Sequence, residues 1–254
     1  MARKASFYYN KTFISNESGL YTIVVANNIE RMKAVFLLTG TEVWVSADQV
    51  DKGNVRDVFK PNTVNVGYLG NQSATDGSGN HLKEYEIWHA MLERCYGSRD
   101  LESYKYCIVS EEFHSFEYFY NWYNKQKGAK SEGWQLDKDI LSDGCKIYAE
   151  DTCVLVPRDI NMFFAQTCGR TYQNVSKTKY VVGVNWDKQR KKFQSKYNNG
   201  GDKVISYHDS EWEAFLAYKR AKETRAKQLA KEYYGLIDHR VYDKLMNYKV
   251  LLTD

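Results

Sequence analysis

The stretch from residue 134 to residue 161 constrains the fold most, because it predicts two short strands and a helix in a set order. Residues 134–136 predict a strand that leads into the charged run 137–139. Residues 154–156, Val-Leu-Val, predict a second strand, and Pro157 suits the first turn of a helix that follows directly. The expected order is therefore strand, loop, strand, helix.

A glycine-rich segment, residues 67–80, marks the clearest boundary in the chain. It combines four glycines with Ser, Asn and Asp, a composition typical of a flexible loop or linker. The preceding residues, 1–66, predict a small β-rich module with strands at 20–25, 31–38 and 42–45. This module shows no combination of residues that suggests chemistry, so we expect an accessory fold.

Beyond the boundary, two apolar stripes recur at helical spacing, and we interpret both as core. Their residues are Ile87, Trp88, Met91, Leu92 and Cys95, then Phe113, Phe116, Phe119, Tyr120 and Tyr123. Together with the two strands described above, they predict a central domain at 81–172. A C-terminal module is expected at 173–254. The predicted class is α+β.

The composition excludes some classes of function. No apolar run has the length of a membrane span, and the N-terminus lacks the apolar core of a signal peptide. We therefore expect a cytoplasmic protein with no membrane partner. The net charge of +4 is weak evidence for a nucleic-acid partner. The five cysteines are odd in number and lack CxxC spacing, which favours reduced thiols over a zinc site.

A carboxylate on the first strand and a carboxamide on the helix form a pair that can bind one divalent ion. Asp137 and Asn161 occupy these positions. Oxygen ligands suit Mg²⁺, which can touch a scissile phosphate and neutralise the charge that develops there. The pattern predicts a metal-dependent nuclease. The competing interpretations are a solvated turn for Asp137 and Asp139, and a structural amide for Asn161.

Several segments in this region resemble phage members of the HNH homing endonuclease family. Residues 88–96, Trp-His-Ala-Met-Leu-Glu-Arg-Cys-Tyr, look like its W-x-x-M-x-x-R-C segment, and residues 111–123 resemble the aromatic helix that follows. Residues 136–139, Leu-Asp-Lys-Asp, stand where the family has L-D-[HR]-x-D. Residues 148–161 resemble its Tyr-to-Asn stretch of strand and helix.

The resemblance implies a ββα-metal fold in which Asp137 and Asn161 bind Mg²⁺ or Mn²⁺. Lys138 stands where the family has the His that activates water, and Thr152 stands where it usually has an Asn. A lysine with its ordinary pKa of about 10.4 is a poor general base. In a working nuclease, Asp139 or His114 could substitute for the missing His.

The C-terminal module has the densest positive charge in the chain. Between residues 177 and 203, the basic residues are Lys177, Lys179, Lys188, Arg190, Lys191, Lys192, Lys196 and Lys203. Only Asp187 and Asp202 oppose them. Strands are expected at 180–186, 188–197 and 204–207, with a helix from Glu211.

On the second of these strands, Lys188, Arg190 and Lys192 would alternate onto one face, with Trp186 on the same side. A positive sheet with an aromatic side chain can contact phosphates and enter a major groove. A solvated basic face is the alternative. Further along the helix, we interpret the basic residues as surface; they are Lys219, Arg220, Lys222, Arg225, Lys227 and Lys231.

Residues 182–195, which include Val-Gly-Val-Asn-Trp-Asp-Lys, resemble the AP2 domain, and residues 213–218 look like its E-A-x-x-A-Y helix. The family's L-G-x-[FY] strand is replaced by Ile-Ser-Tyr at 205–207. An AP2 domain is a three-stranded sheet plus a helix, and it reads DNA through the sheet. The resemblance implies double-stranded DNA as the partner, contacted by Trp186, Lys188, Arg190, Lys192 and Lys196.

The sequence therefore predicts a DNA-binding protein that cleaves DNA with a divalent ion, as homing endonucleases do. Two alternatives stay open. One is a DNA-binding or host-takeover regulator that has lost cleavage, which the lysine at position 138 favours. The other is a protein that inhibits a host enzyme, with the basic strand contacting an acidic partner.

Overall fold

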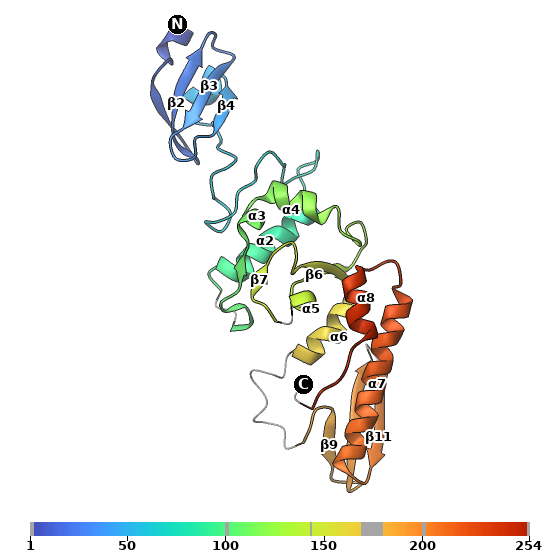
Figure 1. Cartoon of the computed structure of the whole chain (residues 1–254). Helices are drawn as coiled ribbons and strands as arrows, with labels where there is room; N and C mark the ends of the chain where they lie inside the picture. Colours follow the sequence, from blue (N-terminus) through green and yellow to red (C-terminus); the bar gives the residue numbers. More distant parts are fainter. Residues whose placement is uncertain (1–2, 100–101, 143, 169–179, 200–201, 253–254) are drawn as a thin grey trace. The chain divides into compact units, whose positions relative to one another are not determined.

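The computed structural model describes residues 3–99, 102–142, 144–168, 180–199 and 202–252 (Figure 1). The chain combines helices with several small sheets, so the expected α+β class is confirmed. It divides into two compact units, Met1–Asn121 and Trp122–Asp254. Within the described ranges, no helix is long and apolar enough to cross a membrane.

The first unit begins with a four-stranded antiparallel sheet in which sequential strands are neighbours. The strands are β1 (Thr12–Ser15), β2 (Gly19–Ala26), β3 (Met32–Phe36) and β4 (Glu42–Val45). One face of the sheet packs with residues from the short helices η1 (Ala5–Phe7) and α1 (Ala47–Asp51) and their flanks. The three predicted strands of this module are confirmed. Strand β1 was missed because four residues of mixed polarity give no clear alternation.

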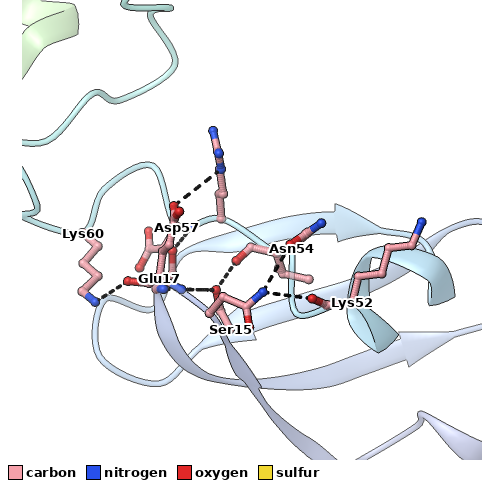
Figure 2. A network of polar contacts seen from close by, with 10 residues as sticks. Ser15, Glu17, Lys52, Asn54, Asp57 and Lys60 are labelled. Carbon is pink, nitrogen blue, oxygen red and sulfur yellow. Dashed lines mark hydrogen bonds and ion pairs between the residues drawn. The ribbon is translucent and has the colours of Figure 1, made fainter.

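A network of polar contacts closes one end of this sheet (Figure 2). The Ser15 hydroxyl donates to the carbonyl of Val55 at 2.6 Å. The buried carboxylate of Asp57 accepts from the Thr39 hydroxyl in the β3–β4 turn. Lys60 donates to a carbonyl in the β1–β2 turn. These contacts satisfy the buried polar groups of Ser15 and Asp57. They fix residues 55–60, which follow the sheet, against its turns, so we interpret the network as structural.

Helices dominate the chain between residues 83 and 123. The elements are α2 (Lys83–Tyr96), η2 (Glu102–Tyr104), β5 (Ile108–Val109), α3 (Glu111–His114) and α4 (Phe116–Tyr123). The predicted core stripes are largely buried, and the fully buried side chains are Trp88, Met91, Leu92, Phe113, Phe116, Phe119 and Tyr123. The expected single aromatic helix is in fact two, because Ser115 has extended backbone with ψ 119°.

The glycine-rich segment, residues 67–80, is irregular, as expected, but its beginning is held in place. The N–H of Tyr68 donates to the carbonyl of His114 at 3.0 Å. A Cβ added to Gly67 would lie 2.8 Å from the Trp88 ring. The role of Gly67 is therefore to allow the backbone to pack closely against α2, and not to make the segment flexible.

The second unit contains the predicted strand, loop, strand and helix. The elements are β6 (Trp134–Asp137), α5 (Asp139–Ser142), β7 (Ile147–Tyr148), β8 (Val154–Pro157) and α6 (Arg158–Cys168). Strands β6 and β8 pair antiparallel, with Gln135 opposite Val156 and Asp137 opposite Val154. All four residues of β8 are buried, which explains its continuous apolar sequence.

A three-stranded antiparallel sheet and two helices complete the second unit (Figure 1). They are β9 (Val184–Asp187), β10 (Lys192–Asn199), β11 (Asp202–His208), α7 (Glu211–Glu232) and α8 (His239–Met246), with β10 in the middle of the sheet. The third strand and the helix start were predicted correctly. The second strand begins four residues later than expected, because residues 188–191 form a turn. Lys177, Lys179 and the expected boundary at 172–173 lie outside the described residues.

Helix α7 contributes to two cores. Residues of its first half, such as Phe215 and Tyr218, pack with Val184 and Tyr197 of the sheet. Residues of its second half pack with α8 and with the hairpin and helix that precede the sheet. These second-half residues are Ala226, Leu229 and Ala230, and their partners include Val156, Ile160, Phe163, Val241 and Leu245.

Lys222 lies at the middle of α7, and the expectation that it is a surface residue is wrong. It is 1% exposed. Its ammonium lies 5.7 Å from the ring centre of Phe163, 5.8 Å from that of Tyr218 and 5.7 Å from that of Tyr248. Aromatic rings from both cores surround the cation, an arrangement that compensates part of its lost hydration.

Candidate functional site

Asp137 ends strand β6 and caps the short helix α5. Its Oδ1 accepts the N–H groups of Asp139 and Ile140, each at 2.8 Å. Burial raises the pKa of the Asp137 carboxyl, while the two backbone N–H groups oppose the rise. A partly buried carboxylate that is costly to ionise is suited to a cation ligand, because the cation would offset the lost hydration.

Asn161 lies in α6 and reaches back to strand β6. Its Nδ2 donates to Oε1 of Gln135 at 2.6 Å. Gln135 and Asp137 are two residues apart, so they project from the same face of β6. The amide of Asn161 is thus directed toward the strand face that carries Asp137.

This donor set fits the hard divalent ions that the sequence implied. With Nδ2 of Asn161 engaged by Gln135, its Oδ1 is the atom available as a ligand. Carboxylate and amide oxygens are the ligand types that Mg²⁺ and Mn²⁺ accept. In the part of the chain that the structure describes, no cluster of three or more His, Cys, Asp or Glu residues could hold a metal. The proposed site is instead a pair of one carboxylate and one carboxamide.

Lys138, the residue that follows Asp137, is buried. It is 4% exposed, and its ammonium forms an ion pair with the carboxylate of Asp139. The Tyr148 ring centre lies 5.7 Å from the ammonium. The side chain of Asp139 is 44% exposed, compared with 5% for Lys138, so Asp139 is the more accessible of these two candidate bases.

Two other residues singled out in the sequence have clear local surroundings. The Thr152 hydroxyl donates to the carbonyl of Ile147 at 2.8 Å and accepts the N–H of Ala149, so it fastens the turn before β8. His114 ends α3 in the first unit, with Nε2 3.5 Å from the Tyr96 hydroxyl. Burial lowers the pKa of His114, and the neighbouring Glu111 and Glu112 oppose this shift.

The three-stranded sheet has two unlike faces. Residues Val184, Ser195 and Tyr197 are buried and face α7. By alternation, Gln194 and Lys196 of β10 point the other way, together with their cross-strand partners on β9 and β11. We call this second side the outer face; its residues are Asn185, Asp187, Lys192, Gln194, Lys196, Asn198, Lys203, Ile205 and Tyr207.

The structure corrects the predicted basic strand. Lys188 and Arg190 lie in the turn between β9 and β10, so they do not alternate with Lys192 along a strand. Trp186 pairs with Phe193, and its ring lies 4.8 Å from the Phe193 ring. Since Phe193 and Lys192 are adjacent, Trp186 projects from the side opposite to Lys192. The sequence pattern failed here because the turn residues share the polar character of the strand ends.

The turn and the outer face meet in a set of side-chain contacts. The Arg190 guanidinium carbon lies 4.6 Å from the Tyr207 ring centre, and Nη1 donates to Oδ2 of Asp187 at 3.2 Å. Gln194 donates to the Tyr207 hydroxyl at 3.2 Å. Lys192 pairs with Asp209 at 3.1 Å. Sequence reasoning missed Tyr207, Gln194 and Gln135, although alternation on β11 would have indicated Tyr207.

Comparison of the chain with models of protein families, with curated protein sequences and with solved structures found no significant match.

Proposed function

We propose that the chain is a double-stranded DNA-binding protein that uses the outer face of the three-stranded sheet and the adjoining turn. The observation that carries this proposal is the separation of the two faces. Helix α7 covers one face, whereas Lys196 and Lys203 stand exposed on the other, and Lys188 is exposed in the adjoining turn. Exposed lysines contact phosphates and release counterions, which supplies affinity for any duplex.

Duplex binding is tested by fluorescence anisotropy with a labelled duplex over a range of salt concentrations. Affinity should fall steeply with salt, and replacing Lys188, Lys196 and Lys203 with Gln should lower the slope by about 2–3. The matched control replaces three exposed basic residues of α7, which are Arg220, Lys227 and Lys231. Equal losses of affinity in both triple variants would show that binding depends on overall charge and not on this face of the sheet. A parent chain that binds no duplex at low salt would favour the role of a protein inhibitor.

A second proposed activity is cleavage of the phosphodiester backbone with Mg²⁺ or Mn²⁺ bound by Asp137 and Asn161. The observation in its favour is that the Asn161 amide reaches the strand face that carries Asp137. A bound divalent ion would stabilise the negative charge that develops at the phosphate. In this proposal the protein's own groups orient the ion, and Asp139, whose side chain is 44% exposed, accepts a proton from water.

Cleavage is tested by incubating supercoiled plasmid with the protein and either metal, with and without EDTA. Conversion to nicked or linear DNA that requires the metal and disappears in Asn161→Ala supports the proposal. Binding without conversion in both metals leaves the regulator as the function. Conversion that persists in EDTA rejects the metal site.

A further inference from the structure

Arg190 is the most constrained cation next to the outer face of the three-stranded sheet. Its guanidinium stacks over Tyr207 at 4.6 Å and bonds to Asp187 at 3.2 Å. Asp187 is itself fixed, because its Oδ1 accepts the N–H groups of Gln189 and Arg190. Tyr207 is held by the bond from Gln194. The guanidinium therefore has a defined orientation before any partner binds.

The neighbouring lysines differ from Arg190 in this respect. Lys188, Lys196 and Lys203 are exposed, and within the described residues their ammonium groups form neither an ion pair nor a hydrogen bond. An ammonium on a flexible stem acts as a point charge and suits phosphates of any sequence. A planar guanidinium in a fixed orientation costs less entropy to bind, and it matches acceptors that lie side by side.

The Arg190 side chain keeps enough donors for such a contact. It is 54% exposed, and Asp187 uses one of its five N–H groups. In the major groove, guanine presents N7 and O6 as adjacent acceptors, and a bidentate arginine contact with them is the most frequent specific contact in protein–DNA complexes. The remaining donors of Arg190 match this pair.

We propose that Arg190 reads a guanine in the major groove, and that Asp187 and Tyr207 act as its positioning residues. The inference rests on the proposed DNA binding, and it adds a base preference to a contact surface that would otherwise be independent of sequence. The exposed lysines provide the phosphate contacts that hold the turn in the groove.

The experiment selects duplexes from a pool with a randomised core by repeated binding to the full chain, followed by sequencing. The parent should enrich a guanine at one position. Arg190→Lys, which keeps the charge but loses the planar fork, should lose an enrichment of about tenfold or more. Lys188→Gln, in the same turn, should weaken binding to all sequences and keep the guanine preference.

A second pair of variants tests the positioning role of Tyr207. Tyr207→Phe keeps the ring under Arg190 and should keep the guanine preference. Tyr207→Leu removes the stacking surface and should reduce the preference while the salt slope of binding stays unchanged. A purely structural role would lower affinity for all duplexes alike, and thermal unfolding of both variants identifies that case.

The outcomes separate this inference from the proposed function. A parent chain that binds no duplex removes both. Salt-dependent binding without base preference keeps DNA binding and overturns the role of Arg190. A guanine preference that survives in Arg190→Lys, or a uniform loss of affinity in that variant, also overturns it and makes Arg190 a phosphate contact.

Discussion

Asn161 and Gln135 are joined by a 2.6 Å hydrogen bond between their side-chain amides, one on helix α6 and the other on strand β6. The bond engages the nitrogen of Asn161 and leaves the amide oxygen available on the side chain. Because Gln135 shares a strand face with Asp137, the bond joins the helix to the strand that carries the proposed carboxylate ligand. The proposed metal site thus depends on a glutamine that ligates nothing.

Introducing the base that the resembled family uses should raise cleavage. In Lys138→His, an imidazole with a pKa of about 6.5 replaces the ion-paired ammonium. Plasmid conversion at neutral pH in Mg²⁺ and Mn²⁺ should then exceed that of the parent, by about tenfold or more. The control is Asp137→Ala in the same background, which should cut nothing. If neither the parent nor Lys138→His cuts in either metal, the regulator becomes the better hypothesis.

The raised pKa of Asp137 predicts that its carboxylate lowers stability at neutral pH. Burial raises the folded-state pKa above the ordinary value, so the native state takes up the proton first as pH falls, and the cost is relieved. Asp137→Asn should therefore increase the free energy of unfolding at pH 7, and its advantage over the parent should shrink toward pH 4. Urea denaturation at the two pH values measures this.

The exposed Asp243→Asn is the matched control and should show no comparable difference. Adding Mg²⁺ should raise the melting temperature of the parent more than that of Asp137→Asn, because only a folded site binds the ion. An Asn variant that is less stable than the parent at pH 7 would show that the carboxylate stabilises the fold.

Gly183 should tolerate no side chain. Its φ is +74°, and an added Cβ would lie 2.2 Å from the Tyr218 ring of α7. Gly183→Ala should cost about 3 kcal/mol or more, since backbone strain adds to overpacking. Gly133 has φ +71° with open space around it, so Gly133→Ala should cost only about 1–2 kcal/mol. Chemical denaturation of the two variants compares them. Similar losses would mean that α7 can move away from the sheet.

Trp186 should matter for stability rather than for DNA. Its ring packs on Phe193, on the side of the sheet opposite to Lys192. Trp186→Ala should lower the free energy of unfolding by about 1–3 kcal/mol and change duplex affinity by less than about twofold. Loss of duplex affinity at unchanged stability would return Trp186 to the DNA interface, where the sequence pattern had placed it.

The elements that sequence predicted well are those with strong hydrophobic periodicity. Examples are the apolar run 154–156 and the stripe around Trp88. Their apolar side chains must face the core, so the sequence pattern alone identifies them. The start of α7 was also predictable, because Ser210 and Glu213 form a capping box.

What the sequence could not reveal depends on tertiary contacts. Lysine is usually a surface residue, and the burial of Lys222 depends on tertiary contacts, among them the rings of Phe163, Tyr218 and Tyr248 around its ammonium. Likewise, Lys138 and Asp139 form an ion pair that hides the lysine, which a motif comparison at position 138 cannot detect. Residues 188–191 form a turn because Asp187 accepts two backbone N–H groups, an interaction that outweighs strand propensity there.

Helix α7 is continuous over 22 residues, a length of about 33 Å at 1.5 Å per residue. Its two halves are anchored in different cores, so the helix itself joins the sheet to the hairpin and helix that carry Asp137 and Asn161. If the chain both reads and cuts DNA, the scissile bond therefore lies at a constant offset from the bases that are read. Inserting one residue into α7 would rotate one half of the helix relative to the other by about 100°. The cleavage position relative to the recognised bases should then change.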